Sequence, residues 1–173
     1  MRQVENPARP TGAQPEAFVR PLRRTDLEMM HEIHALCLTR SLMSHYSMRQ
    51  VQAWMRGRTP MDYWIASETG ENFRVVEVAE VTAGYASWRG DELLSLFVAP
   101  IAQGHGLGKM LFQTCALDAA AAGTPLARVH ATLNATGFFR RLGFHPAEQG
   151  FDEKNGERIP YMLMRGAIDR SDA

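Results

Sequence analysis

Short apolar runs separated by turn residues are the dominant pattern of this chain, and they predict a β-rich core. Runs of four to eight residues, either alternating or continuously apolar, are typical of strands. The runs that predict strands are Ala17–Leu22, Phe73–Ala79, Val81–Trp88, Glu92–Val98, Arg128–Leu133, Phe144–Pro146 and Ile159–Met164. Between the last two runs, the polar stretch 152–158 predicts a loop.

Capping residues mark the helices between these strands. Thr25 and Glu28 have the spacing of a capping box, in which each side chain bonds the backbone N–H of the other residue. This spacing predicts a helix from there to about Ser41. Ser47 and Gln50 repeat the spacing, so a second helix is expected to follow the first after a short connection.

Three later helices are predicted from related signals. Thr59 followed by a proline opens one, although the apolar residues after it also suit a strand. An alanine-rich helix over Gly108–Ala122 is expected to end at Gly123, because glycine readily adopts the conformation that follows a helix. A short helix capped by Asn134 is expected to end at Gly143.

The order of these elements predicts a mixed α/β fold in one domain. Strands come first, and a strand–helix–strand–helix–strand series follows. A chain of 173 residues is long enough to bury a full core in a single domain. We expect this domain to span residues 17–166, between a polar, proline-containing tail at 1–16 and a second tail at 167–173.

Composition and charge argue against several kinds of partner. Lys plus Arg and Asp plus Glu number 19 each, and this zero balance disfavours capture of nucleic acid or an anionic membrane. The longest apolar run, 93–102, is interrupted by Ser95 and Pro100 and is far shorter than a membrane span. The N-terminus lacks an apolar signal core, and Cys37 and Cys115 form no Cys-x-x-Cys pair, so we expect a cytoplasmic protein with free, buried thiols.

Two histidines and a cysteine recur at every third position of the first predicted helix, which resembles a set of metal ligands. His31 and Cys37 are separated by about 9 Å along a helix axis, so one ion can hardly bind both of them and His34 as well. We therefore predict no metal site and interpret the set as a helix edge, with His34 kept as a residue that can line a pocket.

The most informative stretch is Gln103–Lys109, where three glycines join an apolar strand to the start of a helix. Free N–H groups and the positive end of the helix dipole make such a start a site for anions, and glycines let the anion approach the backbone. The residues fit neither a Walker A loop, because Met110 stands where a hydroxyl is needed, nor the dinucleotide pattern, because Lys109 replaces its third glycine. A glycine-rich turn without a ligand is the competing interpretation.

Two blocks of residues resemble the Gcn5-related N-acetyltransferases. Gln103-x-x-Gly106-x-Gly108 is similar to the family's pyrophosphate-binding signature, and Asn134–Phe144 is similar to its C-terminal Asn…Phe-Tyr…Gly-Phe block. The blocks stand in the family's order with a helix and a strand predicted between them. The resemblance implies a mostly antiparallel central sheet that splays near Val98, with acetyl-CoA inserted there.

Carried over by position, the resemblance also implies which residues bind the cofactor. Backbone N–H groups of the glycine loop would hold the pyrophosphate, and the strand before it would pair with the pantetheine arm. The implied cofactor-binding residues are Phe97, Val98, Gln103, Gly104, His105, Gly106, Leu107, Gly108, Lys109, Asn134, Phe138 and Arg140. For Arg140, a solvated helix face is an equally good interpretation.

Acetyl transfer to an amine needs a proton acceptor, because a free alkylamine is protonated at neutral pH. Some family members place a glutamate where Glu92 stands, so Glu92 is the predicted general base, with a charged turn as the alternative and Ser95 and His130 as lesser candidates. Phe139 occupies the position where many members have a tyrosine that donates a proton to the departing sulfur. Tyr161 is the predicted substitute, with water as the alternative.

The acceptor is expected to be a small-molecule or peptide amine that the sequence does not identify further. In the family the first two helices wall the acceptor site, so Tyr46 is predicted to contact substrate, with a role in a capping turn as the alternative. Two rival functions stay open, a non-catalytic acyl-CoA-binding sensor and a transferase for a longer acyl-CoA. The oligomeric state also stays open, a homodimer included.

Overall fold

The computed structural model describes residues 16–166, so the tails predicted at 1–16 and 167–173 lie, apart from residue 16, outside the described residues. One seven-stranded sheet runs through the domain in the order β1-β2-β3-β4-β5-β7-β6. Its strands are β1 (Ala17–Pro21), β2 (Asn72–Val78), β3 (Val81–Arg89), β4 (Glu92–Val98), β5 (Arg128–Ala131), β6 (Phe144–Lys154) and β7 (Glu157–Gly166). Strands β4 and β5 pair in parallel and the other neighbours are antiparallel, which confirms the predicted mixed, mostly antiparallel sheet.

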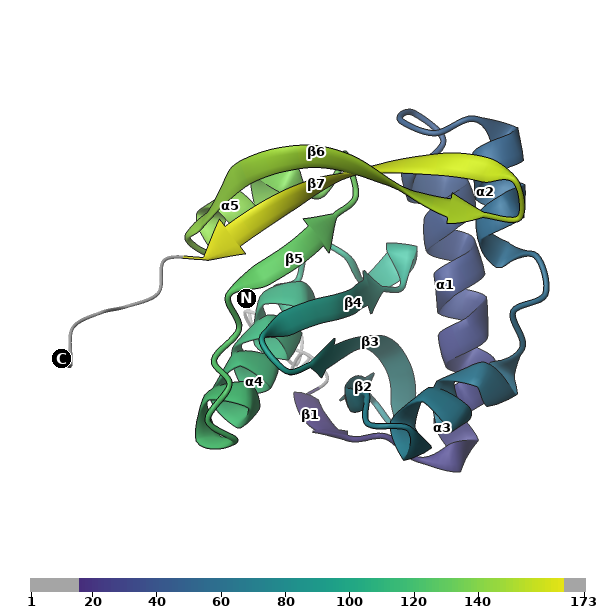
Figure 1. The fold of residues 1–173 in the computed structure, drawn as a ribbon. Coiled ribbons are helices and arrows are strands. Elements are labelled where there is room, and N and C mark those ends of the chain that lie inside the picture. The colour runs from purple at the N-terminus through teal and green to yellow at the C-terminus, as the bar shows by residue number, and fades with distance from the viewer. Residues whose placement is uncertain (1–15, 167–173) are drawn as a thin grey trace, which may run out of the picture.

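Helices cover both faces of the sheet (Figure 1). They are α1 (Leu27–Ser41), α2 (Met48–Met55), α3 (Pro60–Glu68), α4 (Leu107–Ala121) and α5 (Thr136–Arg141), with short 3₁₀ turns at Arg24–Asp26 and Pro100–Ala102. Strand alternation sends Val75 of β2 to the side of α1 and α3 and its neighbour Val76 to the side of α4. Within residues 16–166, the helices are too short or too polar to cross a membrane.

Strands β4 and β5 pair at one end and then separate. Their ladder contains the pairs Glu92↔Arg128 and Leu93↔Val129, whereas the ladder of β4 with β3 continues, with one irregularity, to Val98. The edge of β4 that faces β5 therefore has unpaired backbone groups beyond Leu93. The splay predicted near Val98 is confirmed, and it begins closer to the start of the strand than expected.

The polar loop predicted at 152–158 is wrong, because β6 and β7 continue as a hairpin down to the pair Lys154↔Glu157. Asn155 and Gly156 form the turn with φ angles of 50° and 82°. Both central residues of a tight hairpin turn of this kind need positive φ, which Asn-Gly supplies. The hairpin is long enough to reach α2, as Figure 1 shows, and the Asn155 side chain donates a hydrogen bond of 2.7 Å to the Ala53 carbonyl there.

Two of the predicted helix caps are wrong, because the predicted side chain does not bond a backbone N–H at the start of its helix. The first helix is preceded by a 3₁₀ turn in which the Asp26 carboxylate, not Thr25, accepts a backbone N–H, that of Arg23 at 2.7 Å. The last helix begins after Ala135, and the Asn134 amide reaches 3.4 Å across to the Ser41 carbonyl. The predicted pair of Ser47 and Gln50 is confirmed, with reciprocal bonds of 2.8 and 3.3 Å.

A buried ionic network fixes β1 against the start of α1. The Arg20 guanidinium donates two hydrogen bonds of 2.8 Å to Asp26 and one of 2.6 Å to Glu77 on β2. Thr82 of β3 donates a further bond of 2.9 Å to Asp26. Burial by itself raises the pKa of Asp26, but the hydrogen bonds from Arg20, the Arg23 N–H and Thr82 outweigh it and leave the pKa below its usual value.

We predict that Asp26→Asn lowers the free energy of unfolding by about 3 kcal/mol, because it leaves the buried Arg20 short of a counter-charge. The wild-type contribution should be complete above about pH 4, the pKa range of an unfolded Asp, and should be lost as the pH falls through the lower folded-state pKa. Urea titrations between pH 7 and pH 2 measure this. An Asp26→Asn protein whose stability falls with acid as steeply as the wild type would contradict it.

Candidate active site

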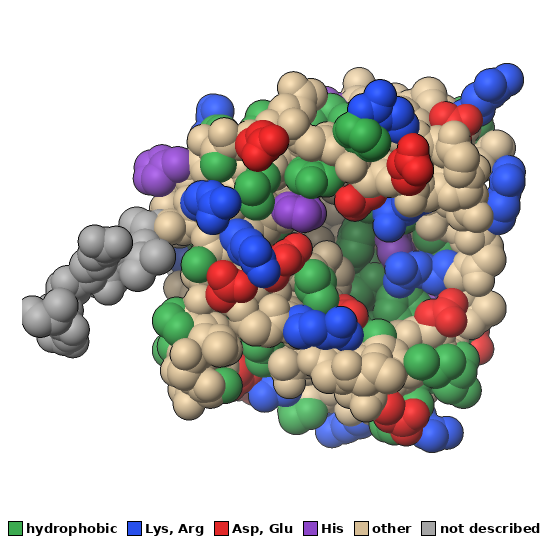
Figure 2. Space-filling view, in the orientation of Figure 1, with side chains coloured by type: hydrophobic (Ala, Val, Ile, Leu, Met, Phe, Trp, Pro, Cys, Tyr) green, Lys and Arg blue, Asp and Glu red, His purple; other side chains and the backbone are tan. Residues whose placement is uncertain are grey.

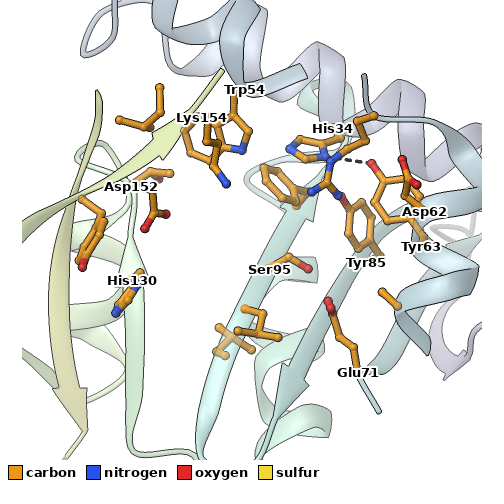
Figure 3. A pocket seen from close by; sticks show the side chains of 18 of the residues that line it. His34, Trp54, Asp62, Tyr63, Glu71, Tyr85, Ser95, His130, Asp152 and Lys154 are labelled. Carbon is orange, nitrogen blue, oxygen red and sulfur yellow. Dashed lines mark hydrogen bonds between the residues drawn. The ribbon is translucent and has the colours of Figure 1, made fainter. Parts of the chain in front are cut away.

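A cavity of about 380 Å³ opens where β4 and β5 have separated. Its walls come from α1 and α3 on one side and from β5, β6 and β7 on the other. Figure 2 shows a hollow on this face with hydrophobic side chains inside it and Arg and Lys side chains at its rim. In the close-up of Figure 3, Ser95 and His34 lie on one side, opposite His130 and Asp152.

An irregularity in β4 decides which of its side chains face this cavity. Ser87 pairs with Ser95 and Trp88 pairs with Leu93, so Leu94 is an extra residue without a partner on β3. Such a bulge shifts the alternation of side chains by one position. Glu92 therefore lines the same cavity as Ser95 and Phe97, although strict alternation would place it on the opposite face.

The two predicted catalytic residues lie near one another at the closed end of the splay. A Glu92 oxygen is 3.3 Å from the Arg128 guanidinium, and the other is 3.9 Å from Nδ1 of His130. The His130 ring stacks on Tyr161, with 4.1 Å between the ring centres and 6° between the planes. Glu92, His130 and Tyr161 thus form a connected group that spans β4, β5 and β7.

Asp91 joins this group from outside the strand. Its carboxylate lies 3.2 Å from the same Arg128 guanidinium that contacts Glu92. Asp91 precedes β4, so strand alternation does not apply to it and both carboxylates can reach one arginine. Of the two, Glu92 lines the cavity.

His34, which the sequence suggested could line a pocket, lies in the wall of the cavity. Its ring is buried, packs 4.4 Å from the Phe97 ring and has Nδ1 2.9 Å from the Tyr63 hydroxyl (Figure 3). Burial, reinforced by the positive charge of Arg58, lowers the pKa of His34 to about 3. The imidazole is therefore neutral at physiological pH, and its Nε2 has no protein partner within the described residues.

Two further polar groups in this cavity, on Tyr85 and Glu71, were not predicted from the sequence. Tyr85 is fully buried, and its hydroxyl has no partner among the described residues. Glu71 is half-buried, and the ion pairs found within residues 16–166 do not include it. Figure 3 shows the Glu71 carboxylate at the end of the cavity away from Lys154. The cavity therefore presents polar groups that the protein itself leaves unsatisfied.

The glycine loop has the geometry of an anion site. Gly104 and Gly106 have φ angles of 82° and 80°, and a β-carbon built on either would point into open space. Gly106 is the N-cap of α4, whose first four N–H groups have no acceptor within a preceding turn of helix. In the described part of the chain, the backbone N–H groups of 104–109 form no hydrogen bond with other loop or turn residues, whereas Met110 bonds Gly106.

Other predicted cofactor residues cluster around this loop. A β-carbon on Gly108 would lie 3.4 Å from the Phe138 ring, so α4 and α5 meet closely here. The Gln103 amide donates a hydrogen bond of 3.0 Å to the Val98 carbonyl, and the Cys37 thiol donates another of 3.2 Å. Gln103 therefore supports the end of β4 through its side chain. His105 and Lys109 are exposed at the loop, Leu107 is buried, and Arg140 is exposed in the last turn of α5.

Burial raises the pKa of both thiols, that of Cys37 to about 11 and that of Cys115 to about 12. Both cysteines are free and buried, as expected from the sequence. They are therefore protonated at neutral pH and unsuited to act as nucleophiles.

Tyr46 and Phe139 lie in the protein core, outside the walls of the cavity. The Tyr46 hydroxyl donates a hydrogen bond of 2.7 Å to the Pro160 carbonyl and accepts one of 3.0 Å from the Leu133 N–H. Both its donor and an acceptor position are therefore used. Phe139 packs edge-on against Phe144, 5.9 Å between ring centres. The structure thus gives Tyr46 a bracing role, and the substrate contact predicted for it has no support in this geometry.

Among the residues that the structure describes, no group of three or more His, Cys, Asp or Glu side chains is arranged to hold a metal ion. His31, one of the three residues considered for such a site, instead places Nε2 3.1 Å from the Arg58 carbonyl.

Comparison with known proteins gives a match over most of the domain. The family model described as the Acetyltransferase (GNAT) domain matches residues 42–165. A comparison with curated proteins gives no match.

Several solved structures share the fold. A GCN5-related N-acetyltransferase from Rhodopseudomonas palustris, also called a class-II aminotransferase, has a TM-score of 0.78 at 24% identity, over 90% of this chain and 97% of that one. The PaiA N-acetyltransferase from Thermoplasma acidophilum, in complex with coenzyme A, has a TM-score of 0.71 at 18% identity, over 87% of this chain and 98% of that one. YncA from Salmonella typhimurium, a putative acetyltransferase with acetyl-CoA, has a TM-score of 0.62 at 23% identity, over 91% of this chain and 97% of that one.

We predict that Tyr46→Phe lowers the free energy of unfolding by about 1 to 3 kcal/mol, because the Leu133 N–H and the Pro160 carbonyl lose a buried partner. Tyr161→Phe is the matched control, since the Tyr161 hydroxyl has no protein partner in the described residues. Urea unfolding measures both. Unchanged stability of Tyr46→Phe together with a raised KM for an amine would instead support the substrate contact.

Proposed function

The chain belongs to the GNAT acetyltransferase domain family, and from this premise we propose that it moves an acetyl group from acetyl-CoA to a primary amine by direct transfer within a ternary complex. One observation carries the proposal. The unpaired edge of β4 and the free N–H groups of the glycine loop are consecutive in the chain, so an extended molecule with a diphosphate at one end can use both.

The glycine loop fits the diphosphate of CoA. Anions bind well to several N–H groups at a helix start, and the open space above Gly104 and Gly106 leaves room for phosphate oxygens. Lys109 adds a positive charge in the first turn of α4. The pantetheine arm, which carries amide groups, would pair with the free edge of β4 as an additional strand does.

Direct transfer fits the side chains of the cavity. The amine nitrogen forms a bond to the thioester carbonyl carbon, the carbon–sulfur bond breaks, and the amine loses a proton. A backbone N–H of β4 near Phe97 would stabilise the negative charge on the carbonyl oxygen. Both cysteines are buried and protonated, so neither offers a thiolate for a covalent acetyl-enzyme.

Glu92 is the proposed proton acceptor, but it works at a distance. Phe97 lies five residues further along β4, about 17 Å at the usual rise of a strand. A proton released beside Phe97 would therefore reach Glu92 through His130 or through water. Tyr161, stacked on His130, is the proposed donor to the departing sulfur. The thiol has a pKa of about 8.5, so the thiolate also leaves acceptably without a donor.

Phe139 supports the rival in which the protein binds acyl-CoA without turning it over. A phenyl ring cannot donate a proton, and in this structure the ring lies in the core. A third candidate is transfer of a longer acyl group. Calorimetry with acetyl-CoA followed by a thiol-release assay over an amine panel separates the three. Binding of acetyl-CoA without thiol release favours the non-catalytic sensor. Faster thiol release from a longer acyl-CoA favours transfer of a longer acyl group.

We predict that Gly106→Val weakens acetyl-CoA binding by at least about tenfold, because a branched side chain at positive φ distorts the loop and fills the space for phosphate. Gly123→Val is the matched control, since Gly123 has a φ of 79°, has the same open surroundings and lies after the opposite end of α4. Isothermal titration calorimetry measures both. Equal affinities of the two variants would place the diphosphate elsewhere.

We predict that Glu92→Gln lowers kcat by about 10²-fold with little change in acetyl-CoA affinity, because the amide cannot accept the proton. Asp91→Asn is the control, since Asp91 contacts the same Arg128 but does not line the cavity. Thiol-release rates across pH 6–10 give the answer. If Asp91→Asn is as slow as Glu92→Gln, or if the pH profile of Glu92→Gln matches the wild type, the base is another group.

A further inference from the structure

Two parts of the chain that are distant in sequence meet at the outer rim of the cavity. The Asn155 side chain, in the β6–β7 turn, donates hydrogen bonds of 2.7 Å to Ala53 and 3.3 Å to Arg56 at the end of α2. This contact brings Lys154, the last residue of β6, to the connection between α2 and α3. A second, shallower hollow of about 270 Å³ lies at this junction and shares Arg58 and Lys154 with the main cavity.

Backbone hydrogen bonds hold Arg58 in place, and its side chain lies over the Tyr63 ring. The Arg58 N–H donates a hydrogen bond of 3.1 Å to the Met55 carbonyl, and the Arg58 carbonyl lies 3.1 Å from Nε2 of His31. The guanidinium carbon lies 5.4 Å from the centre of the Tyr63 ring. No carboxylate within residues 16–166 comes close enough to Arg58 or Lys154 to form an ion pair.

The rim is more positive than the rest of the cavity. The shallow hollow is lined by Arg56, Arg58 and Lys154 and by one carboxylate, that of Asp62. Asp62 is engaged, because its carboxylate accepts a hydrogen bond of 2.6 Å from the Thr59 N–H at the start of α3. Like charges held together without partners repel one another, and a bound anion would relieve this repulsion.

The same positive charges act on the inner wall. Burial is the largest cause of the low pKa of His34, and the charges of Arg58, His31 and Lys154 lower it further. His34 in turn packs against Phe97, the residue beside which the thioester carbonyl is proposed to lie. The rim cations and the reacting end of β4 are therefore linked through one buried side chain.

We propose that the acceptor is an amine that also carries a carboxylate, as an amino acid does, and that Arg58 and Lys154 bind this carboxylate while the amine faces Phe97. The inference rests on the proposed transferase function and adds the acceptor class. Arg58 offers a planar fork that matches a carboxylate, and Lys154 adds a second positive charge. The His34 Nε2 and the Tyr85 hydroxyl, both without partners, are then free for polar groups of the acceptor.

The cavity also contains features that suit a different acceptor. Glu71 and Asp152 line it and form no ion pair in the described residues, so a polyamine with several positive charges is the contrasting class. Figure 3 shows Glu71 far from Lys154, whereas Asp152 lies on the same strand as Lys154. We favour the carboxylate because the cations at the rim outnumber the free carboxylates there.

The test is a thiol-release assay with acetyl-CoA and the full chain, in which each L-amino acid is compared with its own amide and with spermidine. The amide keeps the amine and side chain and removes the carboxylate charge. We expect the best amino acid to exceed its amide in kcat/KM by about tenfold or more. Equal or faster reaction of the amide, or preference for spermidine, overturns the inference and leaves the transferase function intact. No release from any amine overturns both.

Variants test the two side chains directly. Arg58→Gln and Lys154→Gln should each raise KM for the preferred amino acid by about tenfold, with little change for its amide and in acetyl-CoA affinity. Arg49→Gln is the control, because Arg49 is an exposed arginine on α2 that lines neither hollow. Equal effects on KM for the amino acid and for its amide, or no effect on either, would show that Arg58 and Lys154 do not bind the carboxylate.

Discussion

The hydrogen bonds between β4 and β5 end after Leu93↔Val129, and the layout of the site follows from this early end. Beyond that pair the backbone of β4 has a free edge, and a free edge inside a sheet is costly unless something covers it. The opening on one face is the cavity, and the same strand continues through Pro100–Ala102 into the glycine loop. The proposed cofactor and acceptor sites therefore share one strand.

Side chains outside the opening hold its two edges apart. On the β4 side, Gln103 and Cys37 both donate to the Val98 carbonyl, so that carbonyl cannot pair across the gap. On the other side, the Tyr46 hydroxyl joins the Leu133 N–H, just after β5, to the Pro160 carbonyl of β7. These contacts connect both edges to the helical layer, which makes the separation a property of the packed domain.

Local patterns in the sequence predicted much of the fold and the glycine loop, because these depend on short-range physics. Alternating apolar residues predicted six of the strands closely, and glycines around a helix start indicated an anion site. The cavity proposed to hold the acceptor could not be predicted in this way. Its wall joins His34, Glu71 and Lys154, which meet only through tertiary packing. Glu92 faces it because of a bulge at Leu94 that alternation does not reveal. The Asn155-Gly156 pair did signal the long hairpin, and the polar residues around it concealed that signal.

The hairpin turn at Asn155 has a consequence for how such a domain can diversify. The β6–β7 arm meets α2 at its tip and contributes Lys154 to the rim, whereas the proposed diphosphate site lies on a separate segment, the loop between Pro100 and Lys109. A change in the length or charge of the arm would therefore reshape the entrance for the acceptor and leave the binding of the acyl donor unchanged. A fold divided in this way can exchange acceptors over evolution while it keeps a single acyl donor.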